Sequence, residues 1–183
     1  TLERYRALAV AQARAGAHIV GPSGMMDGQV AAIREALDTE GFTDVSILAY
    51  TAKYASAFYG PFREAVGSSL QGDRRTYQQD PANRTESVRE LLADLDEGAD
   101  MVMVKPAMSY LDIVRDVAEL ADRPVAAYQI SGEYSMICAA AERGWIDRDA
   151  ALDEAVLSIV RAGASIVLTY AAVEIAGRLR AAT

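Results

Sequence analysis

Met101-Val102-Met103-Val104-Lys105-Pro106 is the stretch from which the fold can be worked out. A short apolar run that ends at turn-forming residues predicts a strand buried on both faces. Pro106 has no amide hydrogen to donate to a neighbouring strand, so the strand is expected to end there. Lys105 is therefore predicted at the carboxyl end of a buried parallel strand, where α/β folds place their chemistry.

Lysine is rare in this chain. Of its 18 basic residues, two are lysines, Lys53 and Lys105, and the others are arginines. Arginine stays protonated in proteins, whereas a lysine near a second cation and apolar walls can lose its proton and act as a nucleophile. The pattern favours two amines kept for attack on a ketone. The alternative is that each lysine extends its charged end to solvent over a buried stem.

Composition excludes several classes of function. The net charge of −8 and the pI near 4.7 disfavour binding to nucleic acid or to an anionic membrane surface. No apolar run reaches the roughly 18 residues that a transmembrane helix needs. One cysteine, Cys138, and one histidine, His18, rule out an internal disulfide and a zinc cluster of the His/Cys type. We expect a cytoplasmic protein, with His18 in the core.

The first residues resemble neither a signal peptide nor a transit peptide, and they lack an initiator methionine. We therefore expect the chain to be a piece of a longer protein.

Predicted strands and helices alternate along the chain. The strands are expected at 17–22, 45–51, 101–105, 124–131 and 165–170, and the helices at 2–15, 27–40, 84–97, 109–121, 134–143, 147–161 and 171–180, with Asp27, Ser109 and Asp147 as N-caps. Strict alternation with short loops predicts a parallel sheet with helices outside it. No G-x-G-x-x-G follows a strand, which disfavours a dinucleotide site.

The predicted fold class is therefore α/β, a (β/α)8 TIM barrel of which the last five or so βα units are present. Residues 1–183 are expected to form a single domain. Five strands cannot close a barrel, so the missing strands are expected upstream or from a partner. An open, doubly wound sheet is the alternative.

Residues 54–81 interrupt the alternation and carry three arginines among aromatic residues. A long segment without periodicity inside a compact domain is typical of an active-site lid. Arginine binds carboxylates through a two-pronged fork, so a lid rich in arginine suggests a substrate with a carboxylate and a ketone. A solvated loop with salt bridges is the alternative. The residues in question are Arg63, Arg74 and Arg75, with Tyr54, Phe58, Tyr59, Phe62 and Tyr77.

Polar side chains at the strand ends are expected to converge on one face of the barrel. They are Ser23, Asp27, Lys53, Lys105, Tyr128, Ser131 and Tyr170. A second group of polar residues lies near one face of the predicted helix 84–97: Glu86, Glu90, Asp94 and Glu97. That face is either solvated or a site for a hard cation held by one carboxylate and waters.

Five motifs resemble the porphobilinogen synthase (5-aminolevulinate dehydratase) family. The motifs are highly specific, and the resemblance extends over essentially the whole chain, which corresponds to the carboxyl-terminal part of that enzyme. The motifs are Met103–Ala107 with Tyr110–Ile113, Ser56–Arg63, Gly72–Gln78, Tyr128–Tyr134 and Met26–Gly28.

The resemblance implies distinct roles for the two lysines. Lys105 matches the lysine that forms a Schiff base with the A-site substrate, and Lys53 matches the lysine that binds the P-site substrate. The other matched residues are implied to bind substrate, chiefly by holding its carboxylates: Arg63, Arg74 and Gln78 in the lid, with Ser131 and Tyr170 beyond it.

The resemblance also implies a lyase that condenses two molecules of 5-aminolevulinate into porphobilinogen, with loss of two waters, in porphyrin and heme biosynthesis. Glu90 matches a carboxylate of an allosteric magnesium site. The family assembles into homo-octamers through an N-terminal arm. The segment that separates zinc-dependent from magnesium- or potassium-type members lies upstream, so the active-site metal stays open. Residues 1–183 alone are expected to be inactive.

Two alternatives remain from the residues. A class I lysine-imine aldolase would want a phosphate site of glycine-rich turns after the late strands, and Tyr170–Val173 offers none. A non-catalytic remnant or assembly module of the family would have no need to retain both lysines.

Overall fold

The computed structural model describes residues 1–65 and 76–181. Its sheet contains five parallel strands, which lie side by side in chain order. They are β1 (Ile19–Val20), β2 (Ser46–Lys53), β3 (Met101–Lys105), β4 (Val125–Tyr128) and β5 (Ile166–Leu168). An open doubly wound sheet reverses its strand order at a switch point, whereas a barrel keeps chain order. The sheet is therefore part of a TIM barrel, as predicted.

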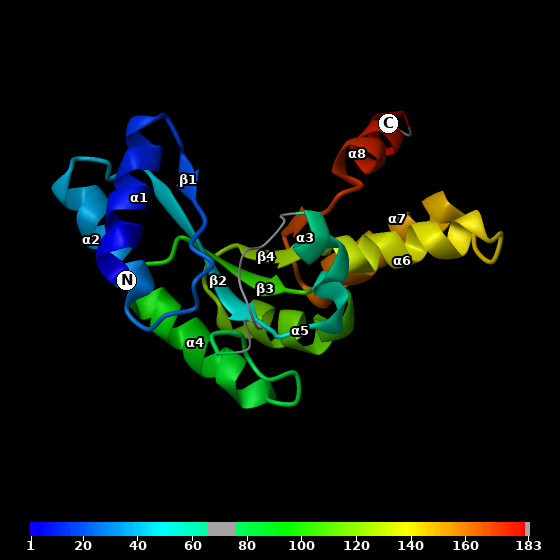
Figure 1. Ribbon diagram of the computed structural model, residues 1–183, viewed down its shortest axis with the longest axis horizontal. Coiled ribbons are helices and arrows are strands. Elements are labelled where there is room, and N and C mark those ends of the chain that lie inside the picture. Colours follow the sequence, from blue (N-terminus) through cyan, green and yellow to red (C-terminus); the bar gives the residue numbers. More distant parts are fainter. Residues whose placement is uncertain (66–75, 182–183) are drawn as a thin grey trace.

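Helices follow each strand, as the predicted alternation requires. They are α1 (Leu2–Arg14), α2 (Gln29–Thr39), α3 (Gly60–Ala65), α4 (Arg84–Asp96), α5 (Leu111–Leu120), α6 (Ser131–Glu142), α7 (Arg148–Ala162) and α8 (Ala172–Ala181). Figure 1 shows α4 and α5 along one face of the curled sheet, with α3 on the other side. In the described part of the chain no helix has both the length and the apolarity to cross a membrane.

The main core lies between the sheet and its outer helices. Alternate residues of a strand face opposite sides, and in β3 the fully buried Val102 and Val104 belong to this core. They pack with side chains of the surrounding helices, such as Leu37, Leu91 and Val114. The other face of β3, which includes Lys105 at its end, points to the inside of the barrel.

A bulge interrupts the pairing between β2 and β3. Ala49 pairs with Val102, but Ala52 pairs with Val104, so two residues of β2 lie opposite one residue of β3. Such a bulge shifts the alternation of side chains by one residue. It allows both Tyr50 and Lys53 to face the inside of the barrel, although strict alternation would put them on opposite faces.

Two of the predicted helix caps are wrong. Helix α2 begins after Gly28, which has a φ of 74°, and not after Asp27. Its free amides are satisfied from a distance, because the Glu97 carboxylate accepts hydrogen bonds from the amides of Gly28 (2.9 Å) and Ala31 (3.2 Å). Ser109 lies within a short 3₁₀ turn that precedes α5 and caps nothing.

The third predicted cap is confirmed, since Asp147 accepts a 2.8 Å hydrogen bond from the amide of Ala150.

The prediction that His18 lies inside a strand and in the core is wrong. His18 precedes the two-residue strand β1 and is exposed.

Candidate active site

A cavity of about 230 Å³ lies at the carboxyl ends of β2, β3 and β4. Strand ends supply its floor, and both ends of the segment 54–81 supply its sides. The lining residues are Ser23, Tyr50, Lys53, Tyr59, Phe62, Tyr77, Gln78, Lys105 and Tyr128. Four of the residues predicted to converge line this cavity, the two lysines with Ser23 and Tyr128. Asp27 does not join them: it is exposed and lies near Glu90.

Lys53 and Lys105 end neighbouring strands in register. Their Cα atoms are partners in the parallel pairing of β2 and β3, so both side chains leave the sheet on the same face. Lys53 is 7% exposed, and its Nζ donates a 2.8 Å hydrogen bond to the carbonyl oxygen of Ser23. Lys105 is half-buried, and its Nζ lies 4.2 Å from the centroid of the Tyr128 ring.

Aromatic rings surround both amines. The Tyr50 ring centroid lies 5.7 Å from Nζ of Lys53 and 5.3 Å from Nζ of Lys105, so the same ring lies beside both amines. Tyr77 adds a ring beside Lys53, and Tyr59 and Phe62 add rings beside Lys105. Ring faces attract an ammonium ion, and their bulk excludes water that would otherwise hydrolyse an imine.

The phenols of Tyr50 and Tyr128 stay protonated at neutral pH. Burial raises the pKa of the Tyr50 hydroxyl. Burial, reinforced by the neighbouring hydroxyl of Tyr170, raises the pKa of Tyr128 to about 12. These side chains can donate a hydrogen bond to a substrate, but they are poor general bases near pH 7.

Three predicted substrate-binding residues lie at or near the cavity. Gln78 lines it, and its Oε1 is buried with no hydrogen-bond partner among the described residues. Ser131 is the first residue of α6, and its buried Oγ is also without a partner in the described part of the chain. Tyr170 follows β5, is half-exposed and packs against the ring of Tyr134 at 5.8 Å.

The structure describes one of the three arginines that were predicted to belong to a lid. Arg63 belongs to α3, directly after the cavity residue Phe62. Arg74, like Arg75, lies outside the described residues.

The segment 54–81 is less irregular than predicted at its start. It contains a 3₁₀ turn, Ala57–Tyr59, followed by α3. The Ser56 hydroxyl accepts a 3.1 Å hydrogen bond from the amide of Phe58 and so caps the turn. Tyr54 is a core residue and not part of a lid: it is 1% exposed, and its ring stacks on Tyr110 at 4.3 Å.

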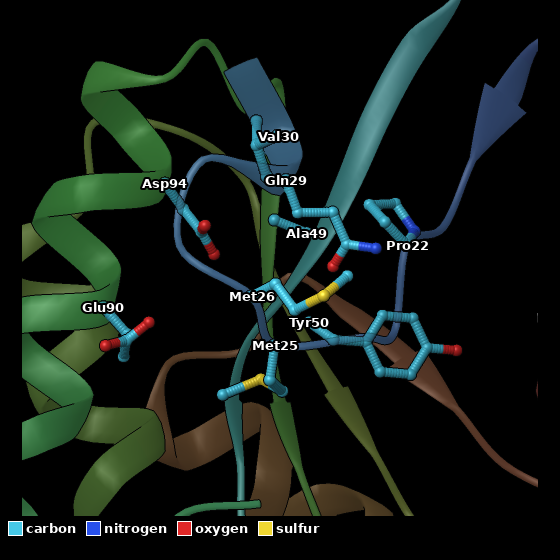
Figure 2. Close-up of a pocket in the computed structure, with 9 residues that line it drawn as sticks. All are labelled: Pro22, Met25, Met26, Gln29, Val30, Ala49, Tyr50, Glu90 and Asp94. Atoms are coloured by element: carbon cyan, nitrogen blue, oxygen red, sulfur yellow. The ribbon is translucent and has the colours of Figure 1, made fainter. Parts of the chain in front are cut away.

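A second, much smaller pocket lies beside α4 (Figure 2). Glu90 and Asp94 point from the helix toward the loop that carries Met25 and Met26. The pocket measures about 10 Å³, close to the space that one water molecule occupies. Tyr50 lines both this pocket and the lysine cavity.

The two carboxylates of this pocket are difficult to ionise together. Burial, with added repulsion from Asp27 and Asp94, raises the pKa of Glu90 to about 7. Burial raises the pKa of Asp94 to about 6, although a 2.7 Å hydrogen bond from the Thr51 hydroxyl opposes the shift. Among the described residues, no three His, Cys, Asp or Glu side chains are grouped as metal ligands.

Tyr50 is the cavity residue that the sequence did not indicate. Counting by twos from Lys53 places Tyr50 on the opposite face of its strand, and only the bulge in β2 brings it inside. No local sequence pattern predicts that bulge. The presence of an aromatic residue three positions before the lysine is the one available hint.

Known proteins resemble this chain over nearly its whole length. The family model described as delta-aminolevulinic acid dehydratase matches residues 1–178. The delta-aminolevulinic acid dehydratase of Streptomyces coelicolor is 72% identical over 180 residues, which are 98% of this chain and 54% of that protein. That of Mycobacterium tuberculosis is 68% identical over 179 residues, again 98% of this chain and 54% of that protein.

A solved structure resembles the fold equally well. It is the delta-aminolevulinic acid dehydratase (porphobilinogen synthase) of Toxoplasma gondii in complex with the reaction product porphobilinogen. The TM-score is 0.92 at 53% sequence identity, and the match covers 94% of this chain and 49% of that chain. The chain thus spans about half the length of the curated relatives that it matches.

Proposed function

The chain belongs to the delta-aminolevulinic acid dehydratase family, and from this premise we propose that the protein is a porphobilinogen synthase. It condenses two molecules of 5-aminolevulinate into porphobilinogen, with loss of two waters, in porphyrin and heme biosynthesis. The observation that carries the proposal is the pair of lysines, Lys53 and Lys105, in register within one aromatic cavity. The family match gives no support to the class I aldolase alternative.

Each lysine captures one substrate molecule through its ketone. The neutral amine adds to the ketone carbon, and the resulting carbinolamine loses water to leave an imine. Lys105 holds the A-site substrate in this way and Lys53 the P-site substrate, so the two imines account for both lost waters. When carbon–carbon and carbon–nitrogen bonds then form between the two substrates, each lysine leaves as an amine and is regenerated.

Neighbouring strand ends provide the proximity that this reaction needs. Two substrates tethered to in-register lysines react as if within one molecule, which can lower the barrier by roughly 7–11 kcal/mol. The carbonyl of Ser23 orients Lys53, and the face of Tyr128 lies against Lys105.

The remaining polar residues are proposed to bind substrate. We assign Ser131 and Tyr170 to one carboxylate, and Arg63, Arg74 and Gln78 in the lid 54–81 to the other substrate. Support comes from the buried Oγ of Ser131 and the buried Oε1 of Gln78, which lack hydrogen-bond partners in the described structure. A buried polar atom without a partner is costly, and a bound substrate would satisfy it.

We propose that Glu90 holds an allosteric magnesium ion. Magnesium is commonly bound by one or two carboxylates with the rest of its shell as water, and Glu90 with the neighbouring Asp94 fits that pattern. Burial raises the pKa values of Glu90 and Asp94, and the crowding of Asp27, Glu90 and Asp94 adds repulsion that a bound cation would relieve. Bound there, the ion supplies charge neutralisation beside Tyr50. The described residues lining the lysine cavity include no carboxylate, imidazole or thiol, so no active-site metal is assigned to this chain.

The domain organisation, the oligomeric state and the cellular compartment are part of the proposal. We place residues 1–183 in one domain of a homo-octamer in the cytoplasm. The family resemblance supports the octamer, and the acidic composition with a single cysteine supports the compartment.

Product formation tests the proposed function. The full-length protein, supplied with 5-aminolevulinate and magnesium, is expected to form porphobilinogen, measured by the colour reaction of its pyrrole. The double variant Lys53→Arg/Lys105→Arg keeps both charges but no nucleophilic amine, and it is expected to form none. Absence of porphobilinogen from the folded wild-type protein would refute the proposal.

A further inference from the structure

Glu133 is a fully buried acidic residue close to the proposed imine site. It is the third residue of α6 and has 0% exposure. Within the described part of the chain, no lysine, arginine or histidine forms an ion pair with it. A buried carboxylate without a cationic partner is costly unless hydrogen bonds satisfy its oxygens.

Backbone amides from two loops supply those hydrogen bonds. One carboxylate oxygen accepts from the amide of Ile130 (2.9 Å), and the other accepts from the amide of Met108 (2.8 Å). The amides of Ala107 and Ser109 stabilise the charged form as well, against the burial that raises the pKa of this carboxyl. Three of the four amides thus belong to the segment that begins two residues after Lys105.

The carboxylate therefore joins the carboxyl ends of two strands. Ile130 follows β4, and residues 107–109 follow β3, so Glu133 fixes one loop relative to the other. Gln129, also fully buried, adds a second connection, since its Oε1 accepts a hydrogen bond from the hydroxyl of Thr169 after β5 (2.5 Å). The same turn of α6 carries the proposed carboxylate ligand Ser131.

The first turn of α6 is also packed tightly against the start of the lid. A Cβ atom at Gly132 would lie 2.0 Å from the carbonyl oxygen of Phe58. The first turn of α6 is thus fixed from the side of the segment 54–81, while the Glu133 carboxylate holds the amides of Ile130 and of the loop after Lys105.

We propose that Glu133 is a positioning residue for Lys105: its carboxylate clamps the backbone at residues 107–109 and so sets the amine of Lys105 relative to Ser131 and the A-site ketone. The inference rests on the proposed function of the same site. It assigns to Glu133 no contact with substrate and no proton transfer.

A matched pair of variants separates this role from general helix capping. Glu86 occupies the same third position of α4 and exchanges hydrogen bonds with its own N-cap, Asn83, but its side chain makes no hydrogen bond to the loop after Lys105. Glu133→Gln and Glu86→Gln therefore remove the same charge from the same helix position. Glu133→Asp keeps the charge but shortens the reach by one methylene.

The readout is the ratio of labels at the two lysines after borohydride reduction with 5-aminolevulinate. In folded full-length Glu133→Gln, separated by size-exclusion chromatography, we expect label at Lys105 to fall at least tenfold relative to label at Lys53. We also expect kcat to fall 10- to 100-fold while KM changes less than threefold. Glu86→Gln should leave the ratio of label at Lys105 to label at Lys53 within twofold of the wild-type value.

An unchanged ratio of label at Lys105 to label at Lys53 in Glu133→Gln would overturn the inference, even if total activity fell. Should that variant fail to fold, Glu133→Asp gives the same decision by the same ratio. Failure of the proposed function itself is distinguishable, because the wild-type protein would then carry 5-aminolevulinate on neither lysine.

Discussion

The Cα atoms of Lys53 and Lys105 are partners across the parallel pairing of β2 and β3. Two amines at equivalent positions of adjacent strands necessarily share a face of the sheet, so a single cavity can contain both. The bulge between Ala49 and Ala52 is what places Lys53 on the inner face in register with Lys105. The proposed catalytic pair thus depends on an irregularity in β2 as much as on the two lysines.

The shared ring of Tyr50 gives a first prediction. Tyr50→Leu removes the aromatic face that lies within 6 Å of both amines, and we expect kcat/KM for 5-aminolevulinate to fall about 2- to 5-fold, consistent with roughly 0.5–1 kcal/mol for a cation–π contact. Tyr50→Phe keeps the face and should stay within twofold of the wild type. Equal losses in the two variants, measured by steady-state kinetics, would assign the effect to the hydroxyl and not to the ring.

Ser131→Ala should weaken substrate binding without weakening the fold. The Ser131 Oγ is buried and has no hydrogen-bond partner among the described residues, so its removal leaves no protein group newly unsatisfied. We expect KM to rise about tenfold while the unfolding midpoint stays level or increases. Thr169→Ala is the contrast, because it removes a hydrogen bond to the buried Gln129 and should lower the midpoint. A fall in the unfolding midpoint of Ser131→Ala would mean that its hydroxyl supports the fold.

Gly132 and Gly177 should respond in opposite directions to alanine. The Gly132 Cβ would meet the carbonyl oxygen of Phe58, whereas Gly177 in α8 has open space around that position. We expect Gly132→Ala to destabilise the protein by about 1–3 kcal/mol, as overpacking does. Gly177→Ala should stabilise it by about 0.5–1 kcal/mol, because alanine favours a helix interior. Denaturant unfolding measures both, and similar values for the two variants would contradict the close approach of Phe58 to α6.

The ion pair between α4 and α5 predicts an acid-dependent loss of stability. Arg84 donates two 2.6 Å hydrogen bonds to the carboxylate of Asp116 and lowers its pKa. A depressed carboxyl pKa gives stability that is present above the unfolded value, near 3.8, and is lost as pH falls through the lower folded value. Arg84 is largely exposed, so solvent screens the pair and Arg84→Gln should cost only a small part of the stability at pH 7.

That cost should shrink as the pH falls below the unfolded value and toward the lower folded pKa of Asp116, where the carboxylate takes up a proton. Arg123→Gln is the matched control, since its partner is the exposed sequence neighbour Asp122 and the pair joins no two helices. Thermal unfolding at pH 7 and pH 3.5 makes the comparison. A loss in Arg84→Gln that is independent of pH would show that packing of the arginine stem, and not its charge, stabilises the contact.

The spacing of apolar residues and the positions of turn-forming and capping residues predicted most of the fold. The strand at 101–105 was predicted to the residue, because four apolar residues followed by Lys105 and Pro106 leave little freedom in where it ends. The cap at Asp147 was also readable, since its partner Ala150 lies three residues away. The cap of α2 was not readable, because Glu97 provides it from 69 residues further along the chain.

The same distinction holds for the site. The two lysines stood out because the chain uses arginine elsewhere, and strand ends of a parallel sheet must meet on one face. The roles of Tyr50 and Glu133 could not be predicted from the sequence, for structural reasons. Tyr50 faces the cavity only through a bulge, and Glu133 acts through amides 25 residues away, near Met108, that have no side-chain signature.

Trapping of the imines tests the central claim most directly. The full-length protein is incubated with 5-aminolevulinate, reduced with borohydride, digested and mapped by mass spectrometry. Reduced adducts of 5-aminolevulinate on Lys105 and on Lys53 are the result that the paired-amine mechanism predicts. Adducts on neither lysine, in protein that is folded, would contradict it.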